Sequence, residues 1–145
     1  MNVTFSRRAD YAIRAVLDIA RAYGTGRRKT REIAAEMNIP PNYLSQILAV
    51  LVRHGILTAV AGQEGGYELA RPPAAIRMLD VLEVFEGAPR IQRCLLRGIP
   101  CGSDGTCAVH DSWTDAQEAL AARLANVTFE ELAERDRALR AGRAG

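Results

Sequence analysis

Apolar residues recur every three to four positions in six segments of the chain, which is the spacing of helices that bury one face. The first segment covers residues 7–23. The second and third cover residues 30–37 and 41–53, and only Asn38-Ile39-Pro40 separates them. Thr30 is a candidate N-cap for the second segment. The pattern therefore predicts a long helix followed by two short helices joined by a tight turn.

The middle of the chain follows a different pattern. Residues 56–60 and 67–70 are rich in residues that favour strands, and the glycine-rich segment 61–66 between them predicts a hairpin. Helical spacing returns in residues 74–86. Two short helices followed by such a hairpin predict a mainly α fold with a small β-hairpin wing, a winged helix-turn-helix domain over residues 1–87.

The last third of the chain begins with a segment that has many Gly and Pro residues and little periodicity, residues 88–106, which predicts a loop. A long helix is predicted from 106 to 125, and Thr128 is placed to cap a last helix. Residues 107–140 would then hold a dimerisation helix and a C-terminal helix, and residues 141–145 a frayed tail.

The second helix of a helix-turn-helix motif enters the DNA major groove with its N-terminal residues. Asn and Gln side chains pair bidentately with adenine, and Ser contacts either partner type. We therefore expect double-stranded DNA as a partner. The expected contact residues are Asn42, Tyr43, Ser45 and Gln46 on the third helix and Gly62 and Gln63 on the wing. The alternative is that these are ordinary core helices, because their apolar spacing would be the same.

The distribution of charge along the chain supports the prediction that it binds DNA. Residues 1–60 carry nine Lys and Arg against four Asp and Glu, a net charge of +5, whereas residues 61–145 carry ten against thirteen, a net charge of −3. A basic half is typical of nucleic-acid binders, although a solvated basic face gives the same count. The basic residues placed to meet phosphates are Arg27, Arg28, Lys29 and Arg31.

Other classes of protein leave signatures that the sequence lacks. It holds no run of about 18 apolar residues and no apolar signal-peptide stretch, so we expect a cytoplasmic protein without a membrane partner. It holds no Ser/His/Asp set, P-loop or dinucleotide fingerprint, so we expect neither an enzyme nor a small-molecule substrate. An iron–sulfur redox enzyme or carrier is the less favoured alternative.

The candidate chemistry lies in three cysteines and a histidine, spaced Cys94-x6-Cys101-x5-Cys107-x2-His110. An odd number of cysteines argues against a disulfide framework. Thiolates and imidazole bind iron–sulfur clusters, but three Cys and one His also suit zinc. Ligand chemistry alone leaves a cluster and zinc open, and bare redox-sensing thiols are a third possibility.

The chain resembles the IscR/NsrR/RirA family of winged-helix regulators along almost its whole length. The similar pieces are Ala9-Asp10-Tyr11-Ala12-Ile13-Arg14, Arg31-Glu32-Ile33-Ala34, Asn42-Tyr43-Leu44, the wing Gly62-Gln63-Glu64-Gly65-Gly66-Tyr67 and the three cysteines. The resemblance implies a transcription regulator whose DNA affinity is controlled by an iron–sulfur cluster that senses redox state, nitric oxide or iron–sulfur status. A zinc-stabilised or thiol-based DNA-binding regulator is the alternative function.

The resemblance also implies a ligand set. In IscR-like members, three Cys and one His hold a 2Fe–2S cluster, which corresponds here to Cys94, Cys101, Cys107 and His110. Other members hold a 4Fe–4S cluster and recruit a carboxylate from the first helix of the partner subunit, for which Asp10 is the candidate. We expect the 2Fe–2S cluster with His110, because the spacing of His110 from Cys107 matches the IscR-like pattern.

Two departures from the family pattern concern DNA contact. Ala61 stands where relatives usually carry an Arg that can enter the minor groove, and Glu64 adds negative charge to the wing tip. We therefore do not expect strong minor-groove contact by the wing. Ser45 stands where some relatives carry Glu, so the preferred DNA sequence is expected to differ.

A homodimer is expected because a long helix follows a compact domain. The residues on one side of that helix are Trp113, Ala116, Leu120 and Leu124. A two-fold interface there would place two recognition helices across successive major grooves.

Overall fold

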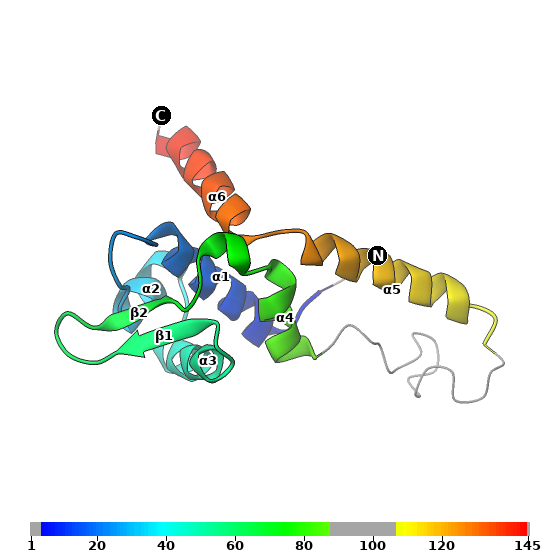
Figure 1. Ribbon diagram of the computed structural model, residues 1–145, viewed down its shortest axis with the longest axis horizontal. Coiled ribbons are helices and arrows are strands. Elements are labelled where there is room, and N and C mark those ends of the chain that lie inside the picture. The colour runs from blue at the N-terminus through cyan, green and yellow to red at the C-terminus, as the bar shows by residue number, and fades with distance from the viewer. Residues whose placement is uncertain (1–3, 88–106, 145) are drawn as a thin grey trace.

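The computed structural model describes residues 4–87 and 107–144. The domain starts with α1 (Arg7–Arg21), α2 (Thr30–Met37) and α3 (Pro41–Arg53), followed by the hairpin of β1 (Leu57–Val60) and β2 (Gly66–Leu69). Then come the 3-10 turn η1 (Pro73–Ala75), α4 (Met78–Glu86), α5 (His110–Ala125) and α6 (Phe129–Ala144). Figure 1 shows α2, α3 and the hairpin gathered around α1, whereas α5 extends away from them. The predicted mainly α fold with a two-stranded wing is confirmed.

The core forms around α1, which packs against α2, α3, α4 and α6. Ala12, Ala15 and Val16 are fully buried on α1, and their small side chains let the neighbouring helices approach closely. Four side chains from α3 meet this face, namely Leu44, Ile47, Leu48 and Leu51. Burial of large apolar side chains on one face of α3 leaves the other face of this helix, which is predicted to read DNA, open to solvent.

The termini of α1 and α2 are set by specific groups. Ser6 Oγ accepts a hydrogen bond from the Ala9 backbone N–H at 3.2 Å, as a helix N-cap does. Lys29, rather than Thr30, stands at the N-cap of α2, where its backbone N–H donates to Glu32 Oε1 at 2.9 Å. The prediction that Thr30 caps this helix was wrong. Asn38 ends α2 in the left-handed conformation, with a φ of 54°.

The wing is an antiparallel pair with Leu57 opposite Leu69 and Val60 opposite Gly66. A third segment joins it, because Arg28 and Tyr67 exchange two backbone hydrogen bonds of 2.9 and 2.7 Å. The residues just before α2 are therefore attached to the outer side of β2. This attachment joins the wing to the helix-turn-helix.

The helix predicted over residues 74–86 is divided in two. Arg77 has extended backbone angles, with φ −92° and ψ 153°, and pairs with Thr128 in an isolated bridge. Its backbone N–H also donates to Asp80 Oδ2 at 2.8 Å. The pairing with a distant part of the chain interrupts the helix, so α4 begins only at Met78.

The two C-terminal helices differ in their packing. Phe129 and Ala133 of α6 are buried in the core, whereas no residue of α5 is fully buried. The long helix starts at His110 rather than near 106, since residues 107–109 are not helical. The helix α6 continues to Ala144 and so includes most of the segment 141–145 that was predicted to form a frayed tail. Within the described residues, no helix has the length and apolarity needed to cross a membrane.

Candidate nucleic-acid interface

The first turns of α3 present polar side chains to solvent. Asn42, Tyr43, Ser45 and Gln46 are exposed, while Leu44 between them is fully buried. Ser45 Oγ donates to the Pro41 carbonyl at 3.2 Å, which keeps this hydroxyl close to the helix. The four residues predicted to read DNA therefore share one exposed surface at the N-terminal end of the helix.

Aromatic and charged side chains of α1 border this surface. The rings of Tyr11 and Tyr43 lie 6.3 Å apart, and the Arg14 guanidinium lies 4.9 Å from the centre of the Tyr11 ring. Arg14 Nη2 also pairs with Asp10 Oδ2 at 2.7 Å, and Arg14 Nη1 donates to the Met37 carbonyl at 2.6 Å. Asp10, the alternative fourth ligand, is thus held in an ion pair with its own helix.

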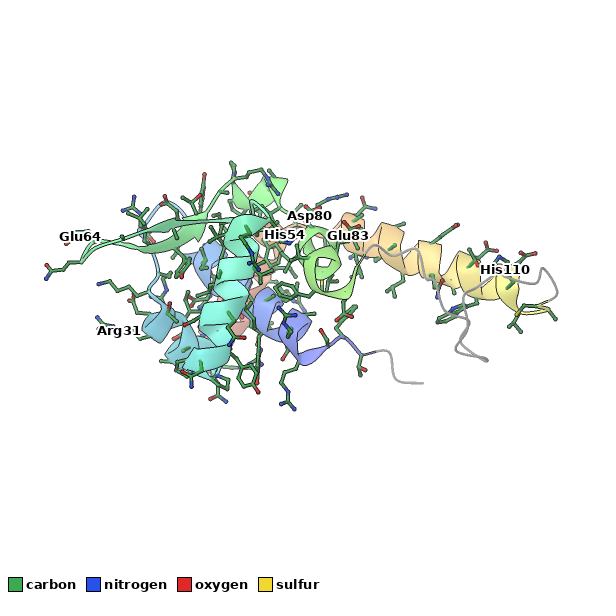
Figure 2. All side chains as sticks on the ribbon, turned by 90° about the horizontal axis from the view of Figure 1, so that it is seen from below. Arg31, His54, Glu64, Asp80, Glu83 and His110 are labelled. Carbon is green, nitrogen blue, oxygen red and sulfur yellow. The ribbon has the colours of Figure 1, made fainter. Side chains whose placement is uncertain are left out.

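The basic residues before and on α2 fall into two groups. Arg28 points inward: its Nε lies 2.9 Å from Asp18 Oδ2, and its Nη1 lies 3.4 Å from Glu32 Oε2. The hydrogen bond donated to Asp18 raises the pKa of the Arg28 guanidinium above its ordinary value. Lys29 and Arg31 make no side-chain ion pair with residues 4–87 or 107–144. Figure 2 shows Arg31 pointing outward at the end of the molecule that carries the wing tip, marked by Glu64.

Sequence reasoning missed the importance of Asp18. At 2% exposure, it is the one buried charged or polar side chain of the described residues. Arg21 Nη2 donates to Asp18 Oδ1 at 2.9 Å, and Arg21 Nε lies 3.1 Å from Asp136 Oδ2 on α6. Arg140 of α6 in turn pairs with Glu36 of α2. The signal in the sequence is a carboxylate inside the apolar stripe of α1, flanked by Leu17 and Ile19.

Two of the four predicted metal ligands lie in the described part of the chain. Cys107 is a half-buried free thiol, and His110 is the first residue of α5. The His110 backbone N–H donates to the Cys107 carbonyl at 3.2 Å, so one turn of chain joins the two residues. Cys94 and Cys101 lie outside the described residues. Figure 2 places His110 at the end of the molecule opposite the wing tip.

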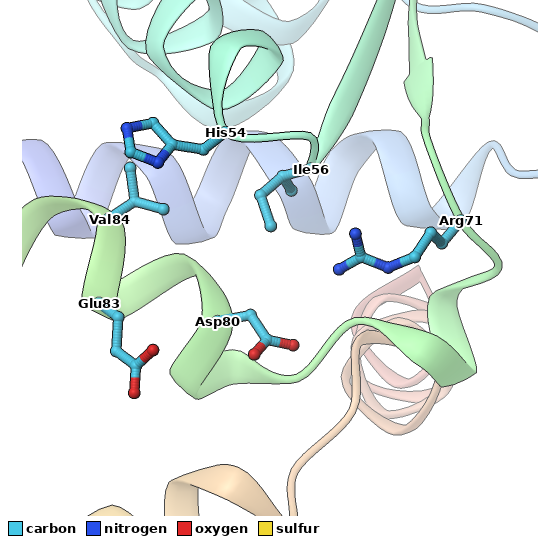
Figure 3. A pocket seen from close by; sticks show the side chains of 6 residues that line it. All are labelled: His54, Ile56, Arg71, Asp80, Glu83 and Val84. Carbon is cyan, nitrogen blue, oxygen red and sulfur yellow. The ribbon is translucent and has the colours of Figure 1, made fainter. Parts of the chain in front are cut away.

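A shallow hollow of about 310 Å³ lies between the end of α3, the segment after β2, and α4. In Figure 3 the side chains of Arg71 and Asp80 face this hollow from opposite sides, with His54 at its rim. Partial burial alone would raise the pKa of the Asp80 carboxyl, but hydrogen bonds from Arg77 and the charge of Arg71 lower it below its ordinary value. Asp80 therefore remains ionised and acts as the cap of α4 rather than as an acid or base.

The side of α5 predicted to form a dimer interface is partly uncovered in the single chain. Leu120 is 44% exposed, Ala116 is exposed, and Trp113 and Leu124 are half-buried. Apolar area of this kind remains available for a second chain.

Comparison with known proteins agrees with this arrangement. The chain is 31% identical to the HTH-type transcriptional regulator IscR of Klebsiella pneumoniae over 84% of its own length and 74% of that protein. Its fold matches the structure of CymR (YrzC), the global cysteine regulator of B. subtilis, with a TM-score of 0.81, 26% identity and coverage of 92% of this chain and 98% of that one. It also matches T. potens IscR with a TM-score of 0.75, 25% identity and coverage of 94% and 90%.

These matches confirm the resemblance to IscR-type winged-helix regulators and identify a transcription regulator rather than an enzyme. The family model for Rrf2, described as an iron-dependent transcriptional regulator, matches residues 5–135. The chain therefore belongs to the Rrf2 family of transcriptional regulators.

Proposed function

We propose that the chain acts as a homodimer that reads DNA with α3 and whose DNA affinity depends on an iron–sulfur cluster. The main evidence for DNA binding is the exposed polar surface at the start of α3, together with two cations, Lys29 and Arg31, that make no ion pair within the described part of the chain. Membership of a DNA-binding family supports the same assignment.

Each group at this surface has a distinct role in the proposal. Asn42, Ser45 and Gln46 supply the hydrogen-bonding groups that recognise base edges in the major groove. Lys29 and Arg31 meet backbone phosphates. Arg28 orients the wing instead, because its guanidinium is already held by Asp18 and its backbone by Tyr67.

The cluster would be held by Cys94, Cys101, Cys107 and His110, with a 2Fe–2S cluster favoured over a 4Fe–4S cluster. The donor chemistry of the described pair fits, since a half-buried thiol and an imidazole lie one turn apart at the start of α5. Asp10 fits less well as the fourth ligand, because it would have to leave its 2.7 Å ion pair with Arg14. A bound cluster would supply a redox- and ligand-sensitive group that fixes the start of α5.

A second candidate is regulation by thiol chemistry, or a zinc-stabilised form, without a cluster. The likeness to CymR supports it, because the matching structures include an oxidized form of Staphylococcus aureus CymR, and because the fold of B. subtilis CymR matches this chain more closely than that of T. potens IscR does. Visible absorption of the anaerobically purified protein separates the candidates. Bands in the visible region support the cluster, whereas a colourless protein supports the thiol or zinc alternative.

The dimer in this proposal uses the exposed side of α5. A two-fold axis that passes beside the exposed side of α5 would bring the same apolar residues of both subunits together, as a symmetric dimer requires. Two copies of α3 would then reach successive major grooves on one face of the duplex.

The DNA assignment is tested by replacing Gln46 with Ala and measuring affinity for DNA selected from a random library. We expect a loss of about 1–3 kcal/mol on the selected site and relaxed preference at one base position. Asn126→Ala serves as the control, because Asn126 is an exposed amide at the end of α5 and is not among the proposed DNA-contact residues. Equal loss on selected and random DNA would show that Gln46 does not read a base.

A further inference from the structure

The wing has the wrong charge for contact with DNA. Residues 57–69 contain two carboxylates, Glu64 and Glu68, and no Lys, Arg or His. DNA carries one negative charge per roughly 1.7 Å of its axis, so a wing with a net charge of −2 would be repelled from it. Glu64 stands at the tip of the wing in Figure 2, where the repulsion would be strongest.

A cation from another part of the chain lies against this wing. Arg27, in the segment before α2, places its Nε 3.6 Å from Glu68 Oε2 and donates from Nη1 to the Glu64 carbonyl at 3.4 Å. Its side chain is 37% exposed. Because a guanidinium has five N–H donors, most of them remain open to a further acceptor.

The backbone holds Arg27 in this position. The two hydrogen bonds between Arg28 and Tyr67 attach the neighbouring residue to β2. Gly66 permits this close approach, since a Cβ at Gly66 would lie 2.7 Å from the Arg28 carbonyl oxygen. Gly66 also has a φ of 137°, which favours glycine. The wing is therefore a composite of β1, β2 and the segment that carries Arg27.

We propose that Arg27 is the DNA-contacting cation of the wing and that Glu68 restrains it. This inference rests on the proposed DNA binding. An exposed ion pair contributes little, so Arg27 can exchange Glu68 for a backbone phosphate when DNA arrives. Glu68 then lowers the affinity in two ways, by competing for Arg27 and by repelling the phosphate.

The test compares Arg27→Ala, Arg27→Lys and Glu68→Gln for binding to the selected site and to random DNA across a range of salt concentrations. Arg27→Ala should weaken binding to both DNAs about five-fold near 0.15 M salt and reduce the salt slope by roughly 0.9, the effect of one lost phosphate contact. Arg27→Lys should retain most of the slope. Glu68→Gln should strengthen binding, because it removes the competitor and leaves the cation.

The sign of the Glu68→Gln effect separates DNA contact from a purely structural role. If Arg27 serves only to hold the wing through Glu68, both exchanges weaken binding, and the proposal is overturned. Arg135→Ala on the exposed face of α6 controls for the loss of one positive charge and should leave the salt slope unchanged. If the wild type binds no DNA, the proposed function itself fails. If the wild type binds DNA and Arg27→Ala binds it with the same affinity and salt slope, only this inference fails.

Discussion

The buried carboxylate of Asp18 on α1 holds the guanidinium of Arg28, with Nε···Oδ2 at 2.9 Å and Nη2···Oδ1 at 3.3 Å. Arg28 is the residue whose backbone pairs with Tyr67 of the wing. One ion pair therefore links the central helix of the core to the hairpin. Arg21 extends the link from Asp18 to α6 through Asp136.

Replacing Asp18 with Asn should destabilise the domain. The exchange preserves the shape of the side chain but leaves the charges of Arg21 and Arg28 without their buried partner. We expect the free energy of unfolding to fall by about 3 kcal/mol, as for one-sided removal of a buried pair. Urea unfolding followed by circular dichroism measures this, and faster hydrogen exchange at the Tyr67 amide would report loosening of the wing.

The matched control is Asp115→Asn, because Asp115 is an exposed carboxylate on α5. It should change the free energy of unfolding by no more than about 0.5 kcal/mol. An Asp18→Asn variant as stable as this control would show that the ion pair does not hold the wing to the core.

Asp80 gives a prediction about pH. Hydrogen bonds from Arg77 outweigh the effect of partial burial and lower the pKa of the Asp80 carboxyl in the folded state. A carboxyl with a lowered folded pKa stabilises the fold above its unfolded pKa and loses that contribution as pH falls through the folded value. Wild type should therefore exceed Asp80→Asn in stability at pH 7, by less than about 1 kcal/mol because Arg77 is well exposed.

The difference should shrink as pH falls below 3.8, the ordinary pKa of the group. Asn retains an oxygen that accepts from the Arg77 backbone N–H, so the comparison isolates the charge. Urea unfolding at pH 7, 5, 4 and 3 measures the difference, again beside Asp115→Asn. A difference that stays constant or widens towards low pH would contradict this account of Asp80.

Leu120 gives a prediction about assembly. Leu120→Glu places a charge in the proposed interface and should produce monomers, since an unpaired charge cannot be buried without large cost. Ala122→Glu adds the same carboxylate to the opposite side of α5 and should remain dimeric. Sedimentation velocity distinguishes the two. If Leu120→Glu forms dimers as stable as those of Ala122→Glu, this side of α5 is not part of the interface.

Much of the helix-turn-helix could be predicted from the sequence because local rules determine it. The apolar spacing of Leu44, Ile47 and Leu48 fixes which face of α3 is buried and so leaves Asn42 and Gln46 exposed. The hairpin was predicted from strand-forming residues on either side of a glycine-rich segment, and the structure shows these two strands paired antiparallel.

Features that depend on distant partners could not be predicted in this way. Arg28 was expected to face phosphates, but its orientation is set by Asp18, a residue on another helix. The break before α4 depends on the pairing of Arg77 with Thr128, which no local pattern reveals. The placement of Cys94 and Cys101 lies outside the described residues, so the ligand set remains a prediction from spacing and family resemblance.

The central claim is that a cluster bound by the cysteines controls DNA affinity. It is tested most directly by anaerobic fluorescence-anisotropy titration of the selected DNA with cluster-loaded wild type, cluster-free wild type and a Cys94→Ala/Cys101→Ala/Cys107→Ala variant. The account predicts that the loaded protein differs from the cluster-free protein at least about five-fold in Kd, the lower end of typical allosteric coupling, and that the triple variant matches the cluster-free protein. The same Kd for all three would contradict it.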